Sequence, residues 1–426
     1  MKQTKTIFIY GFAVFAAFFG AGNLILPPYL GFKSGPDWWL SALGFFLTAT
    51  IIPLGALMAY SRLQGTMLDF GKKVSSSFSL GICILIYMIA LLLPSPRTAA
   101  VTHEMAVAPF IGSSPLLTST VYFALAAIFA LNRGRVMNLL GKYLTPIIGL
   151  ILMAIIGIKL FFDSGVVTES HYQQPLISGF LEGYQTYDAL AGLLMGGVLV
   201  ASIQNSLTGA GFAEKKKLIA GSSLVAMSGL FLIYAGMIYA GSRMSGTVDE
   251  NTERTSLLRL LAETSLGETG FVFLSMLVGL ACFTTAVGIL VGSGDFFKGL
   301  FNESESAYRI TVVVGAVIGI LVGQLNVSYI INVAIPVLMF LYPIIITLII
   351  LNVMPGEWAS SMVFRVVVLI AFVFSIPDFL GFLLPDSSLA NVQNYLPFAK
   401  EGLGWVLPAL MSFVAVNFYL KVRATQ

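Results

Sequence analysis

Long hydrophobic runs, separated by short polar stretches, dominate the pattern of the chain. A run of about 20 apolar residues forms a helix that can cross a hydrocarbon core about 30 Å thick. The pattern therefore predicts an all-α integral membrane protein with about 12 transmembrane helices. The predicted spans cover residues 7–30, 38–60, 78–108, 116–132, 136–162, 178–204, 216–241, 267–297, 307–325, 328–353, 361–384 and 395–420.

The composition supports this class. Hydrophobic residues make up 57% of the chain and charged residues only 10%, whereas soluble domains carry about 25% charged residues. The net charge of +3 gives no reason to expect a nucleic-acid partner. The two cysteines lie inside apolar runs, and the two histidines lack the spacing of a zinc site, so neither a disulfide framework nor a metal cofactor is expected.

The basic residues of the loops predict an orientation. Lys and Arg concentrate in the loops on one side of the predicted spans, and this side is normally cytoplasmic. An even number of spans then places both termini in the cytoplasm of a multi-pass protein of the cell membrane, either inner or plasma membrane. The one long outer loop, residues 242–266, contains an amphipathic piece at 256–261, which could be a lid or a plain interfacial segment.

The first apolar run is interrupted at its centre by Gly20-Ala21-Gly22-Asn23. A glycine costs about 1 kcal/mol relative to alanine inside a helix. A broken backbone in lipid also leaves N–H and C=O groups that need partners, so a break is tolerated only where protein encloses it. We therefore expect an unwound segment that lines a binding site.

A second interruption, at 183–190, lies five spans later. Five is odd, so the two interrupted spans cross the membrane in opposite directions, as in an inverted repeat. Matching interruptions in two halves are typical of a transporter binding site. We predict one transmembrane domain over residues 1–426, with a five-plus-five inverted repeat whose halves are 7–162 and 178–353, broken helices 1 and 6, and two extra helices within 361–420.

The two breaks carry groups suited to a solute and a cation. N–H groups at the start of the outer half-helix suit a carboxylate, and carbonyls at the end of the inner half-helix suit a cation. Asp188 is a charge within a span and marks function by default. It could bind a cation, face a substrate ammonium group or carry a proton, or it could lie in water at a shallower depth. Tyr184, Thr186 and Tyr187 add hydroxyls, although aromatic residues also populate membrane interfaces.

Two further pairs are candidates. Thr284 and Thr285 could supply oxygen ligands to sodium, although threonines in membrane helices often bond back to their own helix. Arg97 and Glu104 lie seven residues apart, which is about two turns along one helix face. They are expected to form either a structural ion pair or a gate.

Five motifs resemble segments of the bacterial branched-chain amino acid:cation symporter family. That family is similar in architecture to the amino acid–polyamine–organocation superfamily, which has a leucine-transporter-like fold with a five-plus-five repeat. The resemblance implies import of leucine, isoleucine and valine, usually with sodium. The motifs are Phe18 to Pro28, Pro96 to Ala99, Gly183 to Ala191, Thr284 to Ala286 and Leu341 to Pro343.

The resemblance also implies roles for particular residues. Asp188 has no assignable counterpart in better-known transporters, and Gln185 and Tyr187 depart from the expected pattern, so the exact substrate stays open. A second cation site could involve Asn23 and Asp188. The predicted substrate-binding residues are Gly20, Ala21, Gly22, Asn23, Tyr184, Thr186, Tyr187 and Asp188. The cation-binding residues that the resemblance implies are Ala16, Phe19, Ala281, Thr284 and Thr285.

The leading hypothesis is a secondary active symporter that works by alternating access. Its partners would be a small amino acid and the lipid bilayer, with Na⁺ as the coupling ion and a proton as the alternative. Other hypotheses are a proton-coupled transporter of another small apolar amino acid, or a channel or sensor. The sequence offers no catalytic set, so an enzyme is not expected, and no other cofactor is implied.

Overall fold

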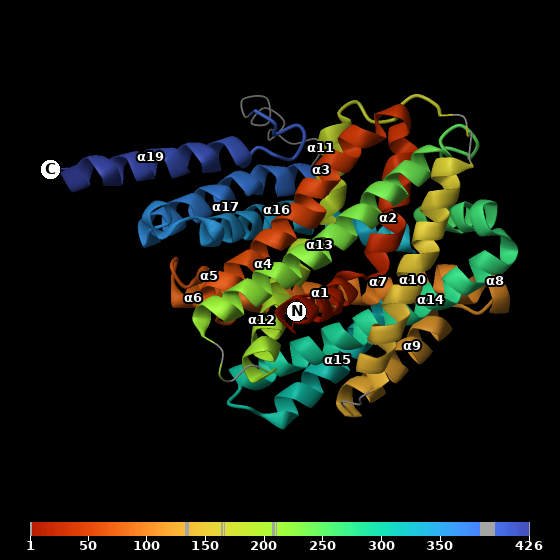
Figure 1. Ribbon diagram of the computed structural model, residues 1–426, viewed down its shortest axis with the longest axis horizontal. Helices are drawn as coiled ribbons and strands as arrows, with labels where there is room; N and C mark the ends of the chain where they lie inside the picture. The colour runs from red at the N-terminus through yellow and green to blue at the C-terminus, as the bar shows by residue number, and fades with distance from the viewer. Residues whose placement is uncertain are drawn as a thin grey trace. The chain divides into compact units, whose positions relative to one another are not determined.

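The computed structural model describes residues 2–132, 136–162, 165, 167–206, 209, 211–383 and 397–425. Within these residues the regular secondary structure is helical, with short 3₁₀ and π segments between longer α-helices (Figure 1). Helices suit a chain embedded in lipid because each satisfies its backbone hydrogen bonds internally. The predicted all-α membrane fold is confirmed. Arg133 and Arg135, two of the basic loop residues behind the predicted orientation, follow the predicted span 116–132 and lie outside the described residues.

Nine helical stretches of the described chain are long and apolar enough to cross a membrane. A tenth is obtained when the broken pair Pro175–Tyr184 and Asp188–Gln204 is taken as one span. The predicted runs at 7–30 and 38–60 share one stretch, Gly22–Leu63, and the predicted fifth run contributes only the shorter apolar segment Pro146–Phe161. The protein is therefore a multi-pass membrane protein, while the count of about 12 spans stays a prediction.

The first predicted run is interrupted where the sequence indicates. Helix α1 (Lys2–Phe18) and helix α2 (Ala21–Ser34) are separated by Phe19 and Gly20. Gly20 is extended, with φ −111° and ψ −174°. The N–H of Asn23 donates to the carbonyl of Gly20 at 3.2 Å, which closes the first turn of α2.

The second interruption separates α11 (Pro175–Tyr184) from α12 (Asp188–Ser206). Its three residues, Gln185, Thr186 and Tyr187, each donate a backbone hydrogen bond to the carbonyl three residues earlier, at 3.0 to 3.3 Å. Tyr187 then takes a left-handed conformation with φ 61°, which is uncommon for a residue other than glycine. Both breaks of the predicted repeat are present, and the repeat itself stays a prediction.

The chain divides into two compact units. The first comprises Met1–Thr50, Ile86–Tyr187 and Leu224–Ile331, and the second comprises Ile51–Leu85, Asp188–Ser223 and Asn332–Gln426. Each unit draws segments from both predicted repeat halves, so the units are a different division of the chain. The halves and the single transporter domain therefore stay predictions.

The first unit is organised around α14, which packs against α2, α7, α9, α10 and α15. Helix α11 packs closely against α3 because glycines face backbone at their contact. A Cβ on Gly179 would overlap the carbonyl of Ser41, and small residues allow this approach between membrane helices. The bounds are α3 Trp38–Phe46, α7 Pro94–Thr102, the π segment η3 His103–Val107, α8 Ala108–Ile111, α9 Pro115–Asn132, α10 Val136–Phe161, α13 Phe212–Ser242, α14 Arg254–Leu300 and α15 Glu305–Gly323.

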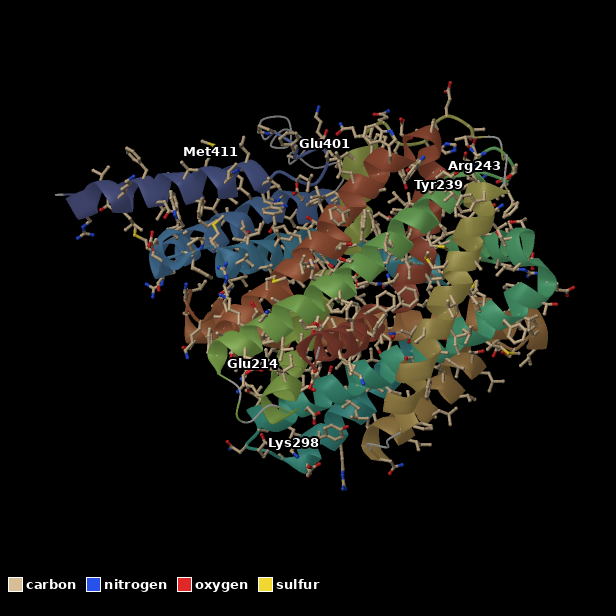
Figure 2. All side chains as sticks on the ribbon, viewed as in Figure 1. Glu214, Tyr239, Arg243, Lys298, Glu401 and Met411 are labelled. Atoms are coloured by element: carbon tan, nitrogen blue, oxygen red, sulfur yellow. The ribbon has the colours of Figure 1, made fainter. Side chains whose placement is uncertain are left out.

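In the second unit, α12 packs against α4 and α17 packs against α19 (Figure 1). The hydroxyl of Tyr60 donates to the carbonyl of Leu193, which ties α4 to α12. Met411 on α19 is 63% exposed and projects from the helix (Figure 2). Exposed apolar side chains of this kind suit contact with lipid tails. The bounds are α4 Ile52–Leu63, α5 Leu68–Gly71, α6 Ser76–Leu92, α16 Val327–Val353, α17 Ser361–Leu383 and α19 Val406–Thr425, with α6, α13 and α16 each shared between the two units.

The long helix α14 contains a break of its own. Gly267 has φ 72° within the helix, at a point where two helical pieces join. The piece before Gly267 contains the amphipathic segment expected at 256–261, and its side chains Leu257, Leu258 and Leu261 are fully buried. The segment therefore packs against protein through its leucines, and a lid function stays a prediction.

Candidate functional site

The side chain of Asn23 holds the first break together. Its amide nitrogen donates to the carbonyl of Phe18 at 3.0 Å and also bonds the hydroxyl of Tyr234 on α13. Asn23 is 2% exposed. The bond to Phe18 satisfies a carbonyl at the end of α1, where the last four carbonyls have no partner within the helix. Tyr234 was not predicted, because a tyrosine inside an apolar run carries no signal of its partner.

The threonines of α14 lie beside the same break. A Cβ on Gly20 would be 3.5 Å from the hydroxyl oxygen of Thr285. The hydroxyls of Thr284 and Thr285 both donate to the carbonyl of Ala281, at 2.9 and 3.0 Å. The bond back to the same helix, which was the structural alternative, is therefore present. It does not exclude cation binding, because a hydroxyl that donates its proton keeps two lone pairs to offer.

The other candidate cation ligands belong to the end of α1. The carbonyl of Ala16 lies in the last turn of α1, and Phe19 is the first residue after the helix. These carbonyls, with the carbonyl of Ala281 and the two threonine hydroxyls, form a set of neutral oxygens. Unwound carbonyls and half-helix ends of this kind coordinate Na⁺ in transporters. Oxygens of this type suit a sodium ion, and their assembly into one cation site stays a prediction.

The second break is buried in protein. Tyr184, Thr186 and Tyr187 are all buried within the protein, and their depth in the membrane stays a prediction. The hydroxyl of Thr186 donates to the carbonyl of Gly183 at 2.8 Å. Asp188, the first residue of α12, is 1% exposed. The alternative of a water-exposed Asp188 is therefore wrong, and its ligand stays a prediction.

Arg97 on α7 brings the two breaks together. Its Nη1 donates to the carbonyl of Gln185 at 2.7 Å, and its guanidinium lies over the ring of Tyr187, 4.8 Å from the centroid. A Cβ on Gly22 would overlap Nη2 of Arg97 and would be 3.4 Å from the carbonyl oxygen of Gln185. The first turn of α2, the interior of α7 and the second break therefore meet at one guanidinium.

The predicted ion pair between Arg97 and Glu104 is wrong. Glu104 accepts from the hydroxyl of Thr255 at 2.6 Å and from the N–H of Val327 at 2.8 Å. The reason is the π segment η3, His103–Val107, which follows α7 and contains Glu104. A π segment has more residues per turn than an α-helix, so the seven-residue spacing no longer places both side chains on one face. A gating role for either residue stays a prediction.

A second charged cluster lies at the start of α14. Arg254 forms an ion pair with Glu182 of α11 at 2.9 Å and lies over the ring of Tyr29, 4.2 Å from the centroid. Tyr172 precedes α11 outside the predicted spans, and its pKa is raised by burial and by the nearby Glu182 carboxylate. The sequence carries no signal of this cluster, because its members come from three distant segments.

Sequence comparison finds related transport proteins. Residues 3–423 match a family model described as branched-chain amino acid transport protein. The chain is 34% identical over 413 residues to the branched-chain amino acid transport system 2 carrier protein of Pseudomonas aeruginosa, a match that covers 95% of this chain and 93% of that protein.

Comparison with solved structures finds the same kind of fold. MhsT in complex with L-phenylalanine has a TM-score of 0.56 at 15% identity, with 96% of this chain and 97% of that chain covered. A Na⁺-coupled sialic acid symporter in its substrate-bound outward-open state has a TM-score of 0.50 at 11% identity, with 98% of both chains covered. At such low identity these likenesses show the fold alone.

Proposed function

Because the chain belongs to the family of branched-chain amino acid transport proteins, we propose that it is a secondary symporter that imports leucine, isoleucine and valine together with Na⁺. Its relatives are named as carriers, which places the protein among transporters and not among enzymes. The observation that carries the proposal is the meeting of the two helix breaks at Arg97, which contacts Gln185 and Gly22. Paired breaks are where transporters of this architecture bind their solutes.

The substrate would bind at the two breaks. The first turn of α2 offers backbone N–H groups at Ala21 and Gly22, and a helix N-terminus favours a carboxylate. The residues proposed to surround the substrate are Gly20, Ala21, Gly22, Asn23, Tyr184, Thr186, Tyr187 and Asp188. An apolar pocket separates side chains that differ by one methylene by only about 1–3 kcal/mol. Leucine, isoleucine and valine should therefore compete for one site.

Sodium would bind next to the first break. The proposed ligands are the carbonyls of Ala16, Phe19 and Ala281 and the hydroxyls of Thr284 and Thr285. The position of Thr285 supports this set, because a Cβ on Gly20, just after the end of α1, would be 3.5 Å from the hydroxyl oxygen of Thr285. A second cation could involve Asn23 and Asp188. Each sodium ion that enters would contribute about 2.3 kcal/mol per 100 mV of membrane potential.

Membrane insertion would follow the loop charges. We place the protein in the cell membrane with both termini in the cytoplasm, as the excess of Lys and Arg in the predicted inner loops favours. Access to the breaks would then alternate between the two sides. A proton in place of sodium is the runner-up, favoured by the buried carboxylate of Asp188.

Uptake into proteoliposomes tests the proposal. Purified protein is reconstituted, and uptake of radiolabelled leucine is measured with an inward Na⁺ gradient, with an inward H⁺ gradient and with neither. We expect accumulation above the external concentration only with the Na⁺ gradient, with unlabelled isoleucine and valine as competitors. Accumulation of leucine driven by the H⁺ gradient alone would show that the coupling ion is a proton and not sodium. Leucine flux that no gradient can drive uphill would overturn symport in favour of a channel.

A further inference from the structure

Arg97 is a buried cation to which the structure gives no anion. It is 3% exposed, and every residue of α7 from Ser95 to Thr102 is buried. No ion pair of Arg97 with a carboxylate occurs in the part of the chain that the structure describes. Its Nε atom, also buried, has no hydrogen-bond partner there. Among the hydrogen bonds between described residues, Nη1 is the one guanidinium nitrogen that donates to another residue.

The groups around the guanidinium are dipoles and a ring. The carbonyl of Gln185 accepts one hydrogen bond at 2.7 Å, and the ring of Tyr187 provides a cation–π contact at 4.8 Å. The side-chain oxygen of Gln185 and the hydroxyl of Tyr187 are themselves buried without partners among the described residues. Three polar side chains at one break thus keep hydrogen-bonding capacity for something that the chain does not supply.

Glu104, which the sequence predicts as an ion-pair partner of Arg97, forms hydrogen bonds with other residues. Both of its oxygens accept hydrogen bonds, one from Thr255 and one from Val327. An isolated buried charge costs several kcal/mol in a low-dielectric interior. A bound anion that accepts two hydrogen bonds from a guanidinium removes much of this cost, because such paired bonds are charge-assisted and matched in geometry.

The position of the guanidinium selects the anion. It lies against Gly22 in the first turn of α2, where backbone N–H groups and the helix dipole also favour negative charge. A carboxylate at this point would accept from Arg97 on one side and from the start of α2 on the other. Of the anions that such a point can bind, a carboxylate is the one that every proposed amino-acid substrate carries.

We propose that Arg97 binds the α-carboxylate of the transported amino acid, in addition to the N–H groups of α2. This inference rests on the proposed function, because it names the group that fixes the common end of all three substrates. It assigns Arg97 to substrate binding in place of the ion pair or gate that the sequence suggested. It also gives Gly22 a reason to lack a side chain, since a Cβ would displace the guanidinium.

Binding of leucine and leucinol tests this assignment. Leucinol keeps the ammonium and the side chain but has a hydroxymethyl group in place of the carboxylate. Affinities are measured on purified wild-type protein in detergent with radiolabelled leucine, with leucinol as competitor. Two or more charge-assisted hydrogen bonds should make leucine bind about 100-fold more tightly than leucinol. Equal affinities in the wild type would overturn the assignment without any variant.

Three variants complete the experiment. R97Q should lower the preference for leucine over leucinol to about 10-fold or less, and R97K should keep an intermediate preference because it retains the charge but not the fork of donors. R62Q is the matched control, since Arg62 is exposed and donates to the carbonyl of Val353. If R97Q keeps the wild-type preference for leucine over leucinol, the assignment of Arg97 is overturned and the proposed function is not. R97K serves the same purpose if R97Q does not fold. If the wild-type protein binds none of leucine, isoleucine and valine, the proposed function is overturned as well.

Discussion

Replacement of Thr285 by valine tests the proposed sodium ligands. Valine keeps the shape of threonine and removes only the hydroxyl, so the packing of residue 285 beside Gly20 can persist. A hydrogen-bonding group that interacts with a charge contributes about 1.5–3 kcal/mol. At about 1.4 kcal/mol per tenfold change, loss of one ligand should raise the Na⁺ concentration for half-maximal leucine uptake by about 10- to 150-fold.

The assay is leucine uptake into proteoliposomes over a series of Na⁺ concentrations. T285S should restore the oxygen and lie close to the wild type. T311V is the matched control, because Thr311 of α15 also donates to the carbonyl four residues earlier, at 2.8 Å, as Thr285 does. If T285V needs no more Na⁺ than T311V, the hydroxyl of Thr285 only bonds its own helix and the assigned cation site is wrong.

Three further changes follow from the described contacts. G22A should weaken leucine binding by about tenfold or more, equal to about 1.4 kcal/mol, because its Cβ displaces the guanidinium of Arg97. G288A is the control, since a Cβ at Gly288 meets open space, and it should bind leucine as the wild type does. Equal leucine affinities of G22A and G288A would contradict the contact between Gly22 and Arg97. R254Q should lower thermal stability in detergent, because the partly buried Glu182 loses its ion-pair partner at 2.9 Å. The loss should lie between the contribution of an exposed ion pair, about 1 kcal/mol, and the cost of breaking a buried one, about 3–5 kcal/mol. An unchanged melting temperature would argue against a stabilising ion pair. D378N should match or exceed the wild type in thermal stability, because Asp378 is buried and an amide has a lower desolvation cost than a charge. The N–H of Gly404, which interacts with the side chain of Asp378, can also donate to the oxygen of an amide. A clear loss of stability would show that the carboxylate has a partner that the amide cannot keep.

Features with a local cause could be predicted from the sequence. Glycines at 20 and 22 weaken a helix wherever they occur, so the first break was visible as a pattern. The second break and the burial of Asp188 followed from the unusual polarity of one apolar run. The approach of Thr285 to Gly20 is in line with the threonine motif, which was informative only together with the family resemblance.

Features that depend on packing between distant segments could not be predicted. The contacts of Arg97 with Gln185 and Gly22 join residues from three parts of the chain. The π segment at 103–107 places Glu104 on a different helix face from Arg97, and no residue type predicts such a segment. For the same reason Tyr234 and Arg254, both central to buried contacts, carried no signal in the sequence.

Coupling between leucine and sodium is the central claim, and reversing the driving force tests it most directly. Proteoliposomes are prepared with equal Na⁺ on both sides, a clamped membrane potential and an inward leucine gradient, and uptake of radioactive Na⁺ is measured. Symport predicts transient accumulation of Na⁺ above its external concentration, driven by leucine alone. Leucine that equilibrates across the membrane while Na⁺ uptake stays at the level of protein-free vesicles would contradict the account.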